Sequence, residues 1–370
     1  MKSHILITAG GTGGHIYPAM ALAKQLQEKN PSTNLMFIGG GLRDNRYFEK
    51  SAFPFQDVSC GSLSPLKPIT SLRNIGRILH GIHQSRRLIK DFSPNLIIGF
   101  GSYHTLPTLL AAKLESVPII LHEANRIPGR VNKYLSRYVK LTGVHFPDTV
   151  EALKGPSVVA SIPLRSGYKK NALPIQVALD YFQLHSGKIT LLVFGGSQGA
   201  DAINKLSSSA ILRLSDVIKR ELQVLHFTGN QRSEQQIREI YMQNGISAVV
   251  KDFESRMDLA WQIADLMISR SGAGTVAEEL EYEVPGILIP YPHAMDNHQE
   301  SNANFMVENV KGALMHRERD LDGDRLAKVI SDLVKDDCLQ LKTMRESMEI
   351  YKRDFKSKEL SEIVIEMLEA

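Results

Sequence analysis

The chain has little cysteine and no long hydrophobic run. Only Cys60 and Cys338 are cysteines among the 370 residues, and they lie far apart in the sequence, which excludes a disulfide framework and a cysteine-based metal site. No apolar stretch is long enough to cross a bilayer, and no signal peptide precedes the first predicted strand. We therefore expect a cytosolic protein.

A strong excess of charge of one sign is also missing. The formal net charge is +4 and the pI is about 8.8. This is too little positive charge to indicate nucleic-acid binding, but it is compatible with attraction to an anionic membrane surface. The hydrophobic content of 43% and the charged content of 23% are typical of a globular protein, and the length favours two domains.

The N-terminal half is organised around a glycine-rich stretch, Gly10-Gly-Thr-Gly-Gly-His15. An apolar run from Ile5 to Ala9 predicts a buried strand before it, and Pro18 is expected in the first turn of a helix after it. A strand, a glycine-rich loop and a helix start suit an anion such as a diphosphate. No Gly-Lys-Ser/Thr follows, which excludes a P-loop. His15 is either a candidate general base or a histidine that only caps or packs there.

Further strands are predicted along the first half, at residues 35–38, 53–58, 96–100, 118–121 and 158–165. Their alternation with helices indicates a parallel, doubly wound sheet, whose ligands bind beyond the carboxyl ends of the strands. Three polar clusters follow predicted strands, at residues 12–15, 101–104 and 122–125. We expect these clusters to meet at one edge of the sheet.

The segment from residue 71 to 90 is predicted to be a basic amphipathic helix. Apolar residues at helical spacing are Leu72, Ile75, Leu79, Ile82 and Ile89, and basic residues around them are Arg73, Arg77, Arg86, Arg87 and Lys90. One interpretation packs the apolar stripe against the sheet. The other brings part of the helix, with the loop from Leu63 to Leu66, to a membrane surface. The two interpretations are compatible.

The second half repeats this plan. A strand at residues 189–194 enters the glycine-rich stretch at 195–199, and further strands are predicted at 222–227, 248–253, 266–269, 286–290 and 311–314. Residues 269–279 turn from a strand into a helix, which places Glu278 well for ribose hydroxyls. Residues 326–370 are predicted to be helical, and the stripe of Leu360, Ile363, Val364 and Met367 should pack back on the first domain.

The predicted fold class is therefore α/β, with two Rossmann-like domains of doubly wound parallel sheet facing across a cleft. The first domain is residues 1–164, on which a C-terminal helix at about 350–370 packs, and the second is residues 165–349. Two such domains fit an enzyme that binds a nucleotide diphospho compound on one side and an acceptor on the other.

A motif for binding a metal is lacking at the strand ends. No Asp-x-Asp occurs there, so helix N-termini and a cation such as Arg165 would stabilise a leaving diphosphate. His293, Asp296 and His298 have a spacing that matches no standard metal motif, and a metal site there is the minor alternative.

Five motifs occur in the order of one known family. They are Gly10-Gly-Thr-Gly-Gly-His15 with Pro18-Ala19, His122-Glu-x-Asn125 with Pro128-Gly129 and Asn132, Gly195-Gly-Ser-Gln-Gly-Ala200, Arg270-Ser-Gly-Ala-x-Thr275-x-x-Glu278, and His298-Gln-x-x-Asn302-Ala303. In these motifs, which span nearly the whole chain, the sequence resembles the MurG family, the UDP-N-acetylglucosamine:lipid I N-acetylglucosaminyltransferases of bacterial peptidoglycan synthesis.

The resemblance implies an inverting GT-B glycosyltransferase of family 28. Such an enzyme transfers N-acetylglucosamine from UDP-N-acetylglucosamine to the 4-hydroxyl of the N-acetylmuramic acid of lipid I, giving lipid II and UDP for the cell wall. It implies no nucleic-acid partner, no bound metal and no required cofactor, with stimulation by a divalent cation left open. It also implies a peripheral location on the anionic inner face of the cell membrane.

The resemblance also implies roles for individual residues. Donor binding is implied for Thr12, Gly13, Gly14, Asn125, Arg165, Ser197, Glu254, Ala273, Gly274, Thr275, Val276, Glu278 and Gln299. Among these, Glu278 would bind the ribose, Gln299 and Asn125 the sugar, and main-chain groups at Glu254 the uracil. The acceptor side would carry His15, Tyr103 and Glu123. His15 would assist deprotonation of the acceptor hydroxyl, or would only bind a phosphate.

The chain departs from the family pattern at three places. Ser161-Ile-Pro-Leu-Arg165 stands where the family has Gly-Asn-Pro-Val-Arg, and Glu254 stands where the family has isoleucine. The turn Gly101-Ser-Tyr-His-Thr-Leu-Pro107 replaces Gly-Gly-Tyr/Phe-x-Ser-x-Pro on the acceptor side. The residues therefore define the donor better than the acceptor.

Other functions on the same scaffold stay open at this point. A UDP-N-acetylglucosamine 2-epimerase would use the same donor without a lipid acceptor. A transferase could act on a different lipid acceptor such as diacylglycerol. A non-catalytic module would bind the nucleotide sugar without turnover.

Overall fold

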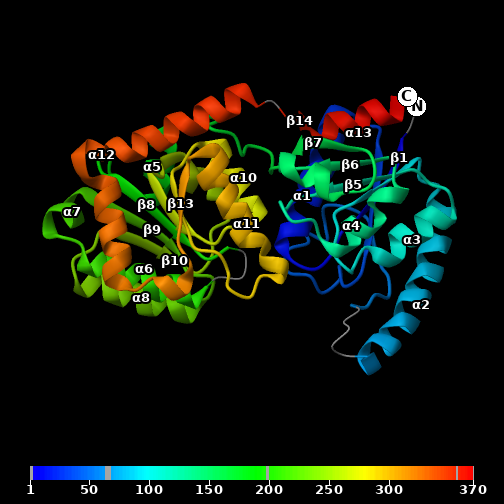
Figure 1. Cartoon of the computed structure of the whole chain (residues 1–370), viewed down its shortest axis with the longest axis horizontal. Coiled ribbons are helices and arrows are strands. Elements are labelled where there is room, and N and C mark those ends of the chain that lie inside the picture. The colour runs from blue at the N-terminus through cyan, green and yellow to red at the C-terminus, as the bar shows by residue number, and fades with distance from the viewer. Residues whose placement is uncertain (1–2, 63–67, 197–199, 356, 370) are drawn as a thin grey trace. The chain divides into compact units, whose positions relative to one another are not determined.

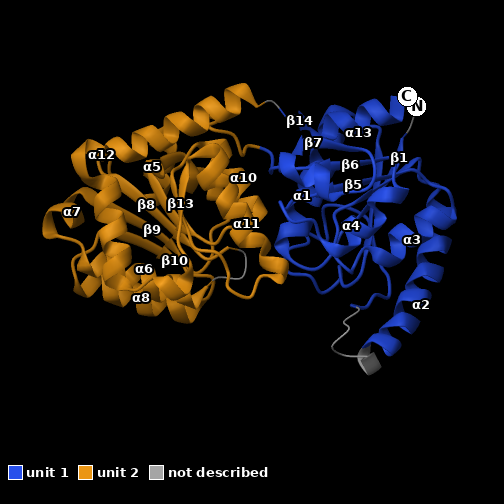
Figure 2. Cartoon of the chain, viewed as in Figure 1, with its two compact units in different colours: residues 1–166, 357–370 blue, residues 167–356 orange. Residues whose placement is uncertain are grey.

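The computed structural model describes residues 3–62, 68–196, 200–355 and 357–369. The chain forms two compact units, which Figure 2 shows in different colours. Unit 1 is residues 1–166 and 357–370, and unit 2 is residues 167–356. The boundary predicted after residue 164 lies two residues before this division, and the C-terminal segment returns to unit 1.

Unit 1 contains a parallel sheet of eight strands, and the prediction of a doubly wound sheet is confirmed. The spatial order is β14-β7-β6-β5-β4-β1-β2-β3. The strands are β1 (His4–Thr8), β2 (Asn34–Gly39), β3 (Phe55–Asp57), β4 (Leu96–Gly99), β5 (Ile119–Glu123), β6 (Leu141–Val144), β7 (Ser157–Ser161) and β14 (Lys358–Glu359). The helices are α1 (Gly13–Lys29), α2 (Pro68–Phe92), α3 (Leu106–Leu114), α4 (Arg130–Leu135) and α13 (Leu360–Glu369). The short strand β6 was not predicted.

Helices cover both faces of this sheet (Figure 1). Because successive strand residues point to opposite faces, Ile5 and Ile7 of β1 pack with α1 and α13, whereas Leu6 packs with residues of α2 and α3. The predicted C-terminal stripe joins the first of these clusters, where Ile363 and Val364 are buried. The core of unit 1 therefore lies on both sides of β1, the strand that leads into the first glycine-rich loop.

Unit 2 contains a parallel sheet of six strands in the order β10-β9-β8-β11-β12-β13. The strands are β8 (Ile189–Phe194), β9 (Leu222–Phe227), β10 (Ala248–Lys251), β11 (Leu266–Ser269), β12 (Gly286–Leu288) and β13 (Ala313–Met315). The helices are α5 (Ile175–Phe182), α6 (Asp201–Arg213), α7 (Asp216–Glu221), α8 (Gln231–Gln243), α9 (Met257–Ile263), α10 (Ala273–Tyr282), α11 (His298–Phe305) and α12 (Gly323–Asp354). The six strands predicted for this half are confirmed, with small differences at their ends.

The predicted continuous helix at residues 326–370 is wrong. Residues 335–338 interrupt α12, which ends at Asp354, and β14 follows it. Lys358 and Glu359 of β14 pair with β7 before α13 begins. Two charged residues carry no strand pattern of their own, so only the free edge of β7 makes them a strand.

The predicted apolar stripe of α2 packs on the core only in its second half, where Ile89 is buried and Ile82 lies against the same cluster. Leu72, Ile75 and Leu79 are 73%, 45% and 62% exposed. The buried face of the helix consists of Asn74, Ile78, Gly81, Ser85 and Ile89, which mixes small, polar and apolar residues. A Cβ on Gly81 would lie 1.9 Å from the carbonyl oxygen of Ser59. Gly81 thus brings α2 close to its neighbours, and Leu72, Ile75 and Leu79 of its first half face outward, whereas Ile78 is buried.

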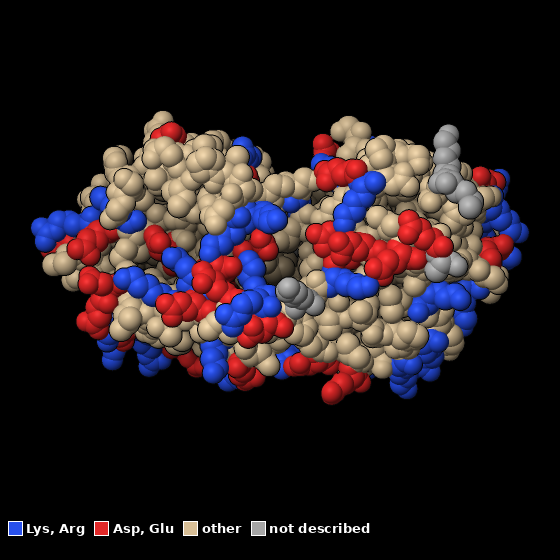
Figure 3. Space-filling model, turned by 90° about the horizontal axis from the view of Figure 1, so that it is seen from above, with Lys and Arg blue, Asp and Glu red and all other residues tan. Residues whose placement is uncertain are grey.

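Charges of both signs are mixed on the face drawn in Figure 3, over each of the two units. This mixing agrees with the small net charge of the chain. Within the described ranges, every helix is too short or too polar to cross a membrane.

Candidate substrate-binding site

The first glycine-rich loop joins β1 to α1 in unit 1. Gly11 has a φ of +87°, which glycine adopts without the steric cost of a Cβ. Thr12 is the N-cap residue of α1, and its side chain makes no capping hydrogen bond. The first N–H groups of the helix and the positive end of its dipole are thus suited to binding an anion.

Pro18 lies in the second turn of α1, not in the first as predicted, because the helix already begins at Gly13. Its ring removes the N–H that would otherwise bond to the carbonyl of Gly14. The early start of the helix places His15 inside its first turn, where the side chain is half-buried and Nδ1 lies 3.4 Å from Oγ1 of Thr12.

A buried histidine lies behind His15. His122 is the last residue but one of β5 and is 2% exposed. Burial, followed by the charges of His145 and His15, lowers the pKa of His122 to about 3. This imidazole is therefore neutral at physiological pH.

Glu123 organises the loop that follows β5. Its carboxylate accepts hydrogen bonds from the backbone N–H groups of Asn125 at 3.0 Å and Gly129 at 2.9 Å, and from Nδ2 of Asn132 at 2.9 Å. Burial raises the pKa of Glu123 more than these hydrogen bonds lower it. The side chain is only 3% exposed, so it holds the loop in place and presents Asn125, which is half-buried.

The turn after β4 packs against the first loop. A Cβ added to Gly10 would lie 2.5 Å from Cβ of His104. Tyr103 is partly buried against the apolar cluster beneath α2 and α3. Since β5, β4 and β1 are neighbours in the sheet, the three polar clusters meet at one edge, as predicted.

Arg165 lies in unit 1, beside α1. Its guanidinium carbon is 4.6 Å from the centre of the Tyr17 ring, a cation–π distance. Nε2 of Gln25 donates a hydrogen bond to the carbonyl oxygen of Leu164 at 3.1 Å. The strand-end segment that carries Arg165 is therefore fixed to α1.

The second half offers a similar helix start, that of α10 after β11. Gly272 is the N-cap residue, and Ala273, Gly274, Thr275 and Val276 form the first turn, which contains no acidic residue. Nothing in this turn opposes the attraction of the helix dipole for an anion.

Glu278 is held by the only tryptophan of the chain. Nε1 of Trp261 donates a hydrogen bond to Oε2 of Glu278 at 2.8 Å. Trp261 is 1% exposed, and its ring stacks on Tyr282 at 6.2 Å and meets Phe194 edge-on. The buried indole thereby orients a carboxylate one turn beyond the helix start.

Gln299 belongs to a network that ties α11 to the start of α10. Its Oε1 accepts a hydrogen bond from the N–H of Tyr291 at 2.9 Å, and its carbonyl oxygen accepts one from Oγ of Ser271 at 2.8 Å. Nδ2 of the buried Asn302 donates to the carbonyl oxygen of Ser271 at 3.2 Å. The network thus holds the Gln299 side chain near the end of β12.

Arg270 of the same motif has a structural role. It is buried, donates hydrogen bonds to the carbonyl oxygens of Ile289 and Pro290 at 3.1 Å each, and pairs with Glu318 at 2.6 Å. It joins the ends of β11 and β12, the neighbouring strands that carry the two segments just described.

Glu254 is buried and fully engaged by its own unit. Its carboxylate pairs with Lys251 at 2.7 Å and accepts hydrogen bonds from the N–H of Arg256 at 2.8 Å and the hydroxyl of Tyr181 at 3.1 Å. Burial raises the pKa of Glu254, but these hydrogen bonds outweigh it and the pKa lies below its ordinary value. The side chain therefore fixes the backbone at this position, where a main-chain contact was expected.

Two expectations concern other parts of the chain. Ser197, expected at the diphosphate, lies outside the described residues, as does the loop at 63–66. In the part of the chain that is described, no group of three or more His, Cys, Asp and Glu side chains is arranged to hold a metal ion. His298, one of the three residues considered for a metal site, instead has its Nδ1 at 2.8 Å from the carbonyl oxygen of Met295.

Sequence reasoning missed two residues that shape these sites. They are Trp261, which holds Glu278, and Tyr17, which contacts Arg165. A lone tryptophan in a helix gives no signal for a polar contact, because the contact joins α9 to α10 across 17 positions of sequence.

Comparison with known proteins places the chain in a family. Residues 5–144 match the N-terminal domain model of glycosyltransferase family 28, and residues 190–362 match its C-terminal domain model. The UDP-N-acetylglucosamine--N-acetylmuramyl-(pentapeptide) pyrophosphoryl-undecaprenol N-acetylglucosamine transferase of Protochlamydia amoebophila is 44% identical over 370 residues, which cover 100% of this chain and 97% of that protein. The chain belongs to glycosyltransferase family 28.

Two further family members support this assignment. The transferase of the same name from Bacillus subtilis is 32% identical over 357 residues, covering 93% of each chain. The crystal structure of Acinetobacter baumannii MurG is 26% identical, with a TM-score of 0.76 and 99% of each chain covered. The predicted GT-B fold and the resemblance to the MurG family are therefore confirmed.

Proposed function

We propose that this glycosyltransferase transfers N-acetylglucosamine from UDP-N-acetylglucosamine to the 4-hydroxyl of the N-acetylmuramic acid of lipid I. The observation that carries the proposal is the 44% identity over the whole chain to a relative named for this reaction. The two units support it, since each contains a glycine-rich helix start suited to an anion. The products are lipid II and UDP.

Unit 2 holds the donor in this proposal. The start of α10 and its residues Ala273 to Val276 bind the diphosphate, and Glu278, oriented by Trp261, accepts hydrogen bonds from the ribose hydroxyls. The main chain at Glu254 binds the uracil, and the Gln299 amide contacts the sugar. Each of these groups is held by hydrogen bonds within unit 2, so little side-chain entropy is lost on binding.

The acceptor belongs to unit 1, and His15 acts there as general base. The oxygen of the acceptor hydroxyl attacks C1 of N-acetylglucosamine, its proton passes to His15, and the bond from C1 to the diphosphate oxygen breaks with its electron pair leaving on UDP. Attack opposite the leaving group inverts the configuration at C1. The contact of Nδ1 with Thr12 orients the imidazole for this role.

No cofactor is required in this scheme. The dipole at a helix start and the guanidinium of Arg165 stabilise the charge that develops on the leaving diphosphate. Thr12, Gly13 and Gly14, at the N-terminal end of α1, also bind the diphosphate in this scheme. Assays with EDTA and with added Mg²⁺ measure whether a divalent cation stimulates the reaction.

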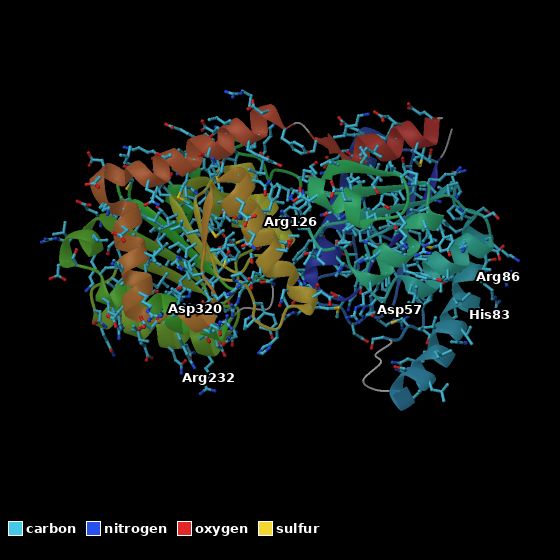
Figure 4. The ribbon with its side chains drawn as sticks, viewed as in Figure 1. Asp57, His83, Arg86, Arg126, Arg232 and Asp320 are labelled. Atoms are coloured by element: carbon cyan, nitrogen blue, oxygen red, sulfur yellow. The ribbon has the colours of Figure 1, made fainter. Side chains whose placement is uncertain are left out.

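The first half of α2 binds the membrane in this proposal. Leu72, Ile75 and Leu79 are exposed beside Arg73 and Arg77, which are also exposed. Figure 4 labels His83 and Arg86 further along α2, where Arg86 is paired with Glu115 at 2.5 Å. Apolar side chains ringed by arginine suit an anionic bilayer surface, and they place the enzyme peripherally on the cytoplasmic face where lipid I is made.

Vesicle sedimentation tests the membrane contact. The double variant Leu72→Ser, Leu79→Ser should bind phosphatidylglycerol vesicles about tenfold more weakly, because it removes most of the insertable apolar area. Met242→Ser, at a 72% exposed position in unit 2, is the matched control. Equal binding by both variants would contradict the assignment of α2.

UDP release tests the reaction itself. Release from UDP-N-acetylglucosamine that depends on a lipid I analogue is the expected result. Consumption of the donor without an acceptor would point to an epimerase, and release that depends on diacylglycerol would point to another lipid acceptor. Tight donor binding with no turnover under any of these conditions would leave a binding module.

A further inference from the structure

The turn after β4 brings a second histidine to the first glycine-rich loop. His104 lies directly against this loop, since a Cβ added to Gly10 would be 2.5 Å from its Cβ, and a Cβ added to Gly11 would be 3.3 Å from its Nδ1. The N–H of Gly40 donates to the carbonyl oxygen of His104 at 3.1 Å. The imidazole is therefore fixed between two glycine segments at the carboxyl edge of the sheet.

One nitrogen of this imidazole is already engaged. Nδ1 lies 2.8 Å from Oγ of Ser102, and the same Oγ accepts a weak hydrogen bond from the backbone N–H of His104 at 3.4 Å. A hydroxyl that accepts from the backbone can still donate its proton to Nδ1. We assign the hydroxyl as the donor to Nδ1, and in this tautomer the ring proton is on Nε2.

The second nitrogen is available to a ligand. Burial lowers the pKa of His104 from its ordinary value of 6.5, so the ring is neutral near pH 7. Nε2 has no hydrogen-bond partner among the described residues. Because the side chain is only half-buried, a ligand can reach this nitrogen. A neutral imidazole with a fixed tautomer thus offers one N–H donor at the edge of the anion-binding loop.

We propose that His104 is a phosphate-binding residue, whose Nε2–H donates a hydrogen bond to a phosphate oxygen of the substrate at the Gly10–Thr12 loop. The proposal rests on the proposed function, which supplies two sources of that phosphate. One is the diphosphate of the lipid acceptor, and the other is the diphosphate of UDP. Ser102 acts through His104 as a positioning residue, because its hydroxyl fixes the tautomer that donates.

Steady-state kinetics with two His104 variants tests this role. His104→Phe keeps a ring against Gly10 but removes the N–H donor, and it should raise the KM for one substrate about tenfold with little change in kcat, since a hydrogen bond to a charged group is lost. His104→Gln restores an N–H donor and should recover most of the loss. A rise for lipid I assigns the acceptor phosphate, and a rise for UDP-N-acetylglucosamine assigns the donor phosphate.

Two further variants separate binding from packing. Ser102→Ala should give a smaller rise in the same KM, about threefold, because the tautomer is no longer fixed. His4→Phe is the matched control, since His4 lies at the opposite end of β1, and it should change neither KM. Unchanged KM values for both substrates in His104→Phe would overturn the proposal, as would a loss that His104→Gln does not recover.

A binding measurement distinguishes this proposal from the proposed function. Adding inorganic diphosphate to protein with ¹⁵N-labelled histidine should shift the Nε2 resonance of His104, an effect that needs no turnover. Wild-type protein that shows this shift but releases no UDP with lipid I would disprove the proposed acceptor and keep the phosphate contact. No shift with either diphosphate or UDP would overturn the role of His104.

Discussion

The helix starts of α1 and α10 have the same backbone plan and different side chains. Both follow a strand of a parallel sheet, and neither carries an acidic residue in the first turn. α1 places a half-buried imidazole, His15, in that turn, whereas α10 places a carboxylate, Glu278, one turn later under a hydrogen bond from Trp261. The backbone supplies attraction for an anion in both units, and the side chains decide the chemistry.

The largest expected effect is the loss of kcat when His15, the side chain that distinguishes α1 from α10, is removed. His15→Ala should lower kcat at least about a hundredfold with little effect on UDP binding, because the general base is lost while the helix start remains. The measurement is kcat together with UDP affinity by calorimetry. A rise in the acceptor KM alone, with kcat retained, would assign His15 to phosphate binding.

The matching change at α10 should act on binding. Glu278→Ala removes the carboxylate that accepts from the ribose, so UDP affinity should fall about tenfold or more. Calorimetry with UDP and with 2′,3′-dideoxy-UDP checks the cause, since the variant should bind both nucleotides equally. A variant that still prefers UDP would disprove the ribose contact.

A smaller effect is expected from the residue that holds Glu278. Trp261→Phe keeps an aromatic ring beside Tyr282 but removes the indole N–H, so UDP affinity should fall about threefold. In the double variant with Glu278→Ala, the tryptophan change should add nothing further, because the two side chains act as one unit. Fully additive losses would contradict this.

The last prediction concerns Glu279. Replacing this residue should change the stability of unit 2 and have the smallest effect on activity. This side chain is 0% exposed and neither carboxylate oxygen has a partner in the described structure, so burial raises its pKa well above 4.5. Below pH 4.5 both the folded and the unfolded state hold the proton. As the pH rises further, the unfolded state loses it first, and stability falls.

Glu279→Met should therefore stabilise unit 2 at pH 8 by about 1–3 kcal/mol, because an unsatisfied buried acid is replaced by an apolar side chain of similar length. Urea unfolding at pH 8 and pH 4.5 measures it, and the difference from wild type should shrink at the lower pH. A difference that does not depend on pH would show that packing, not ionisation, is the cause.

The sequence predicted the parts of this protein that are local. Strand runs such as Ile5 to Ala9 and Ile189 to Phe194 are apolar enough to be recognised alone, and the glycine-rich loops after them mark the strand-to-helix turns. The position of Glu278 beyond a helix start also follows from spacing. Local periodicity fixes which residues form an element and which end of it a motif occupies.

The tertiary structure decided what depends on partners distant in sequence. It exposed Leu72 and Leu79 of α2, because the helix packs through the face that carries Ile78, Gly81 and Ser85. It made Lys358 and Glu359 a strand on the edge of β7, and it put His104 against Gly10 and Trp261 against Glu278. Burial and hydrogen bonding across a sheet edge arise only when separate elements meet, so no single stretch of sequence encodes them.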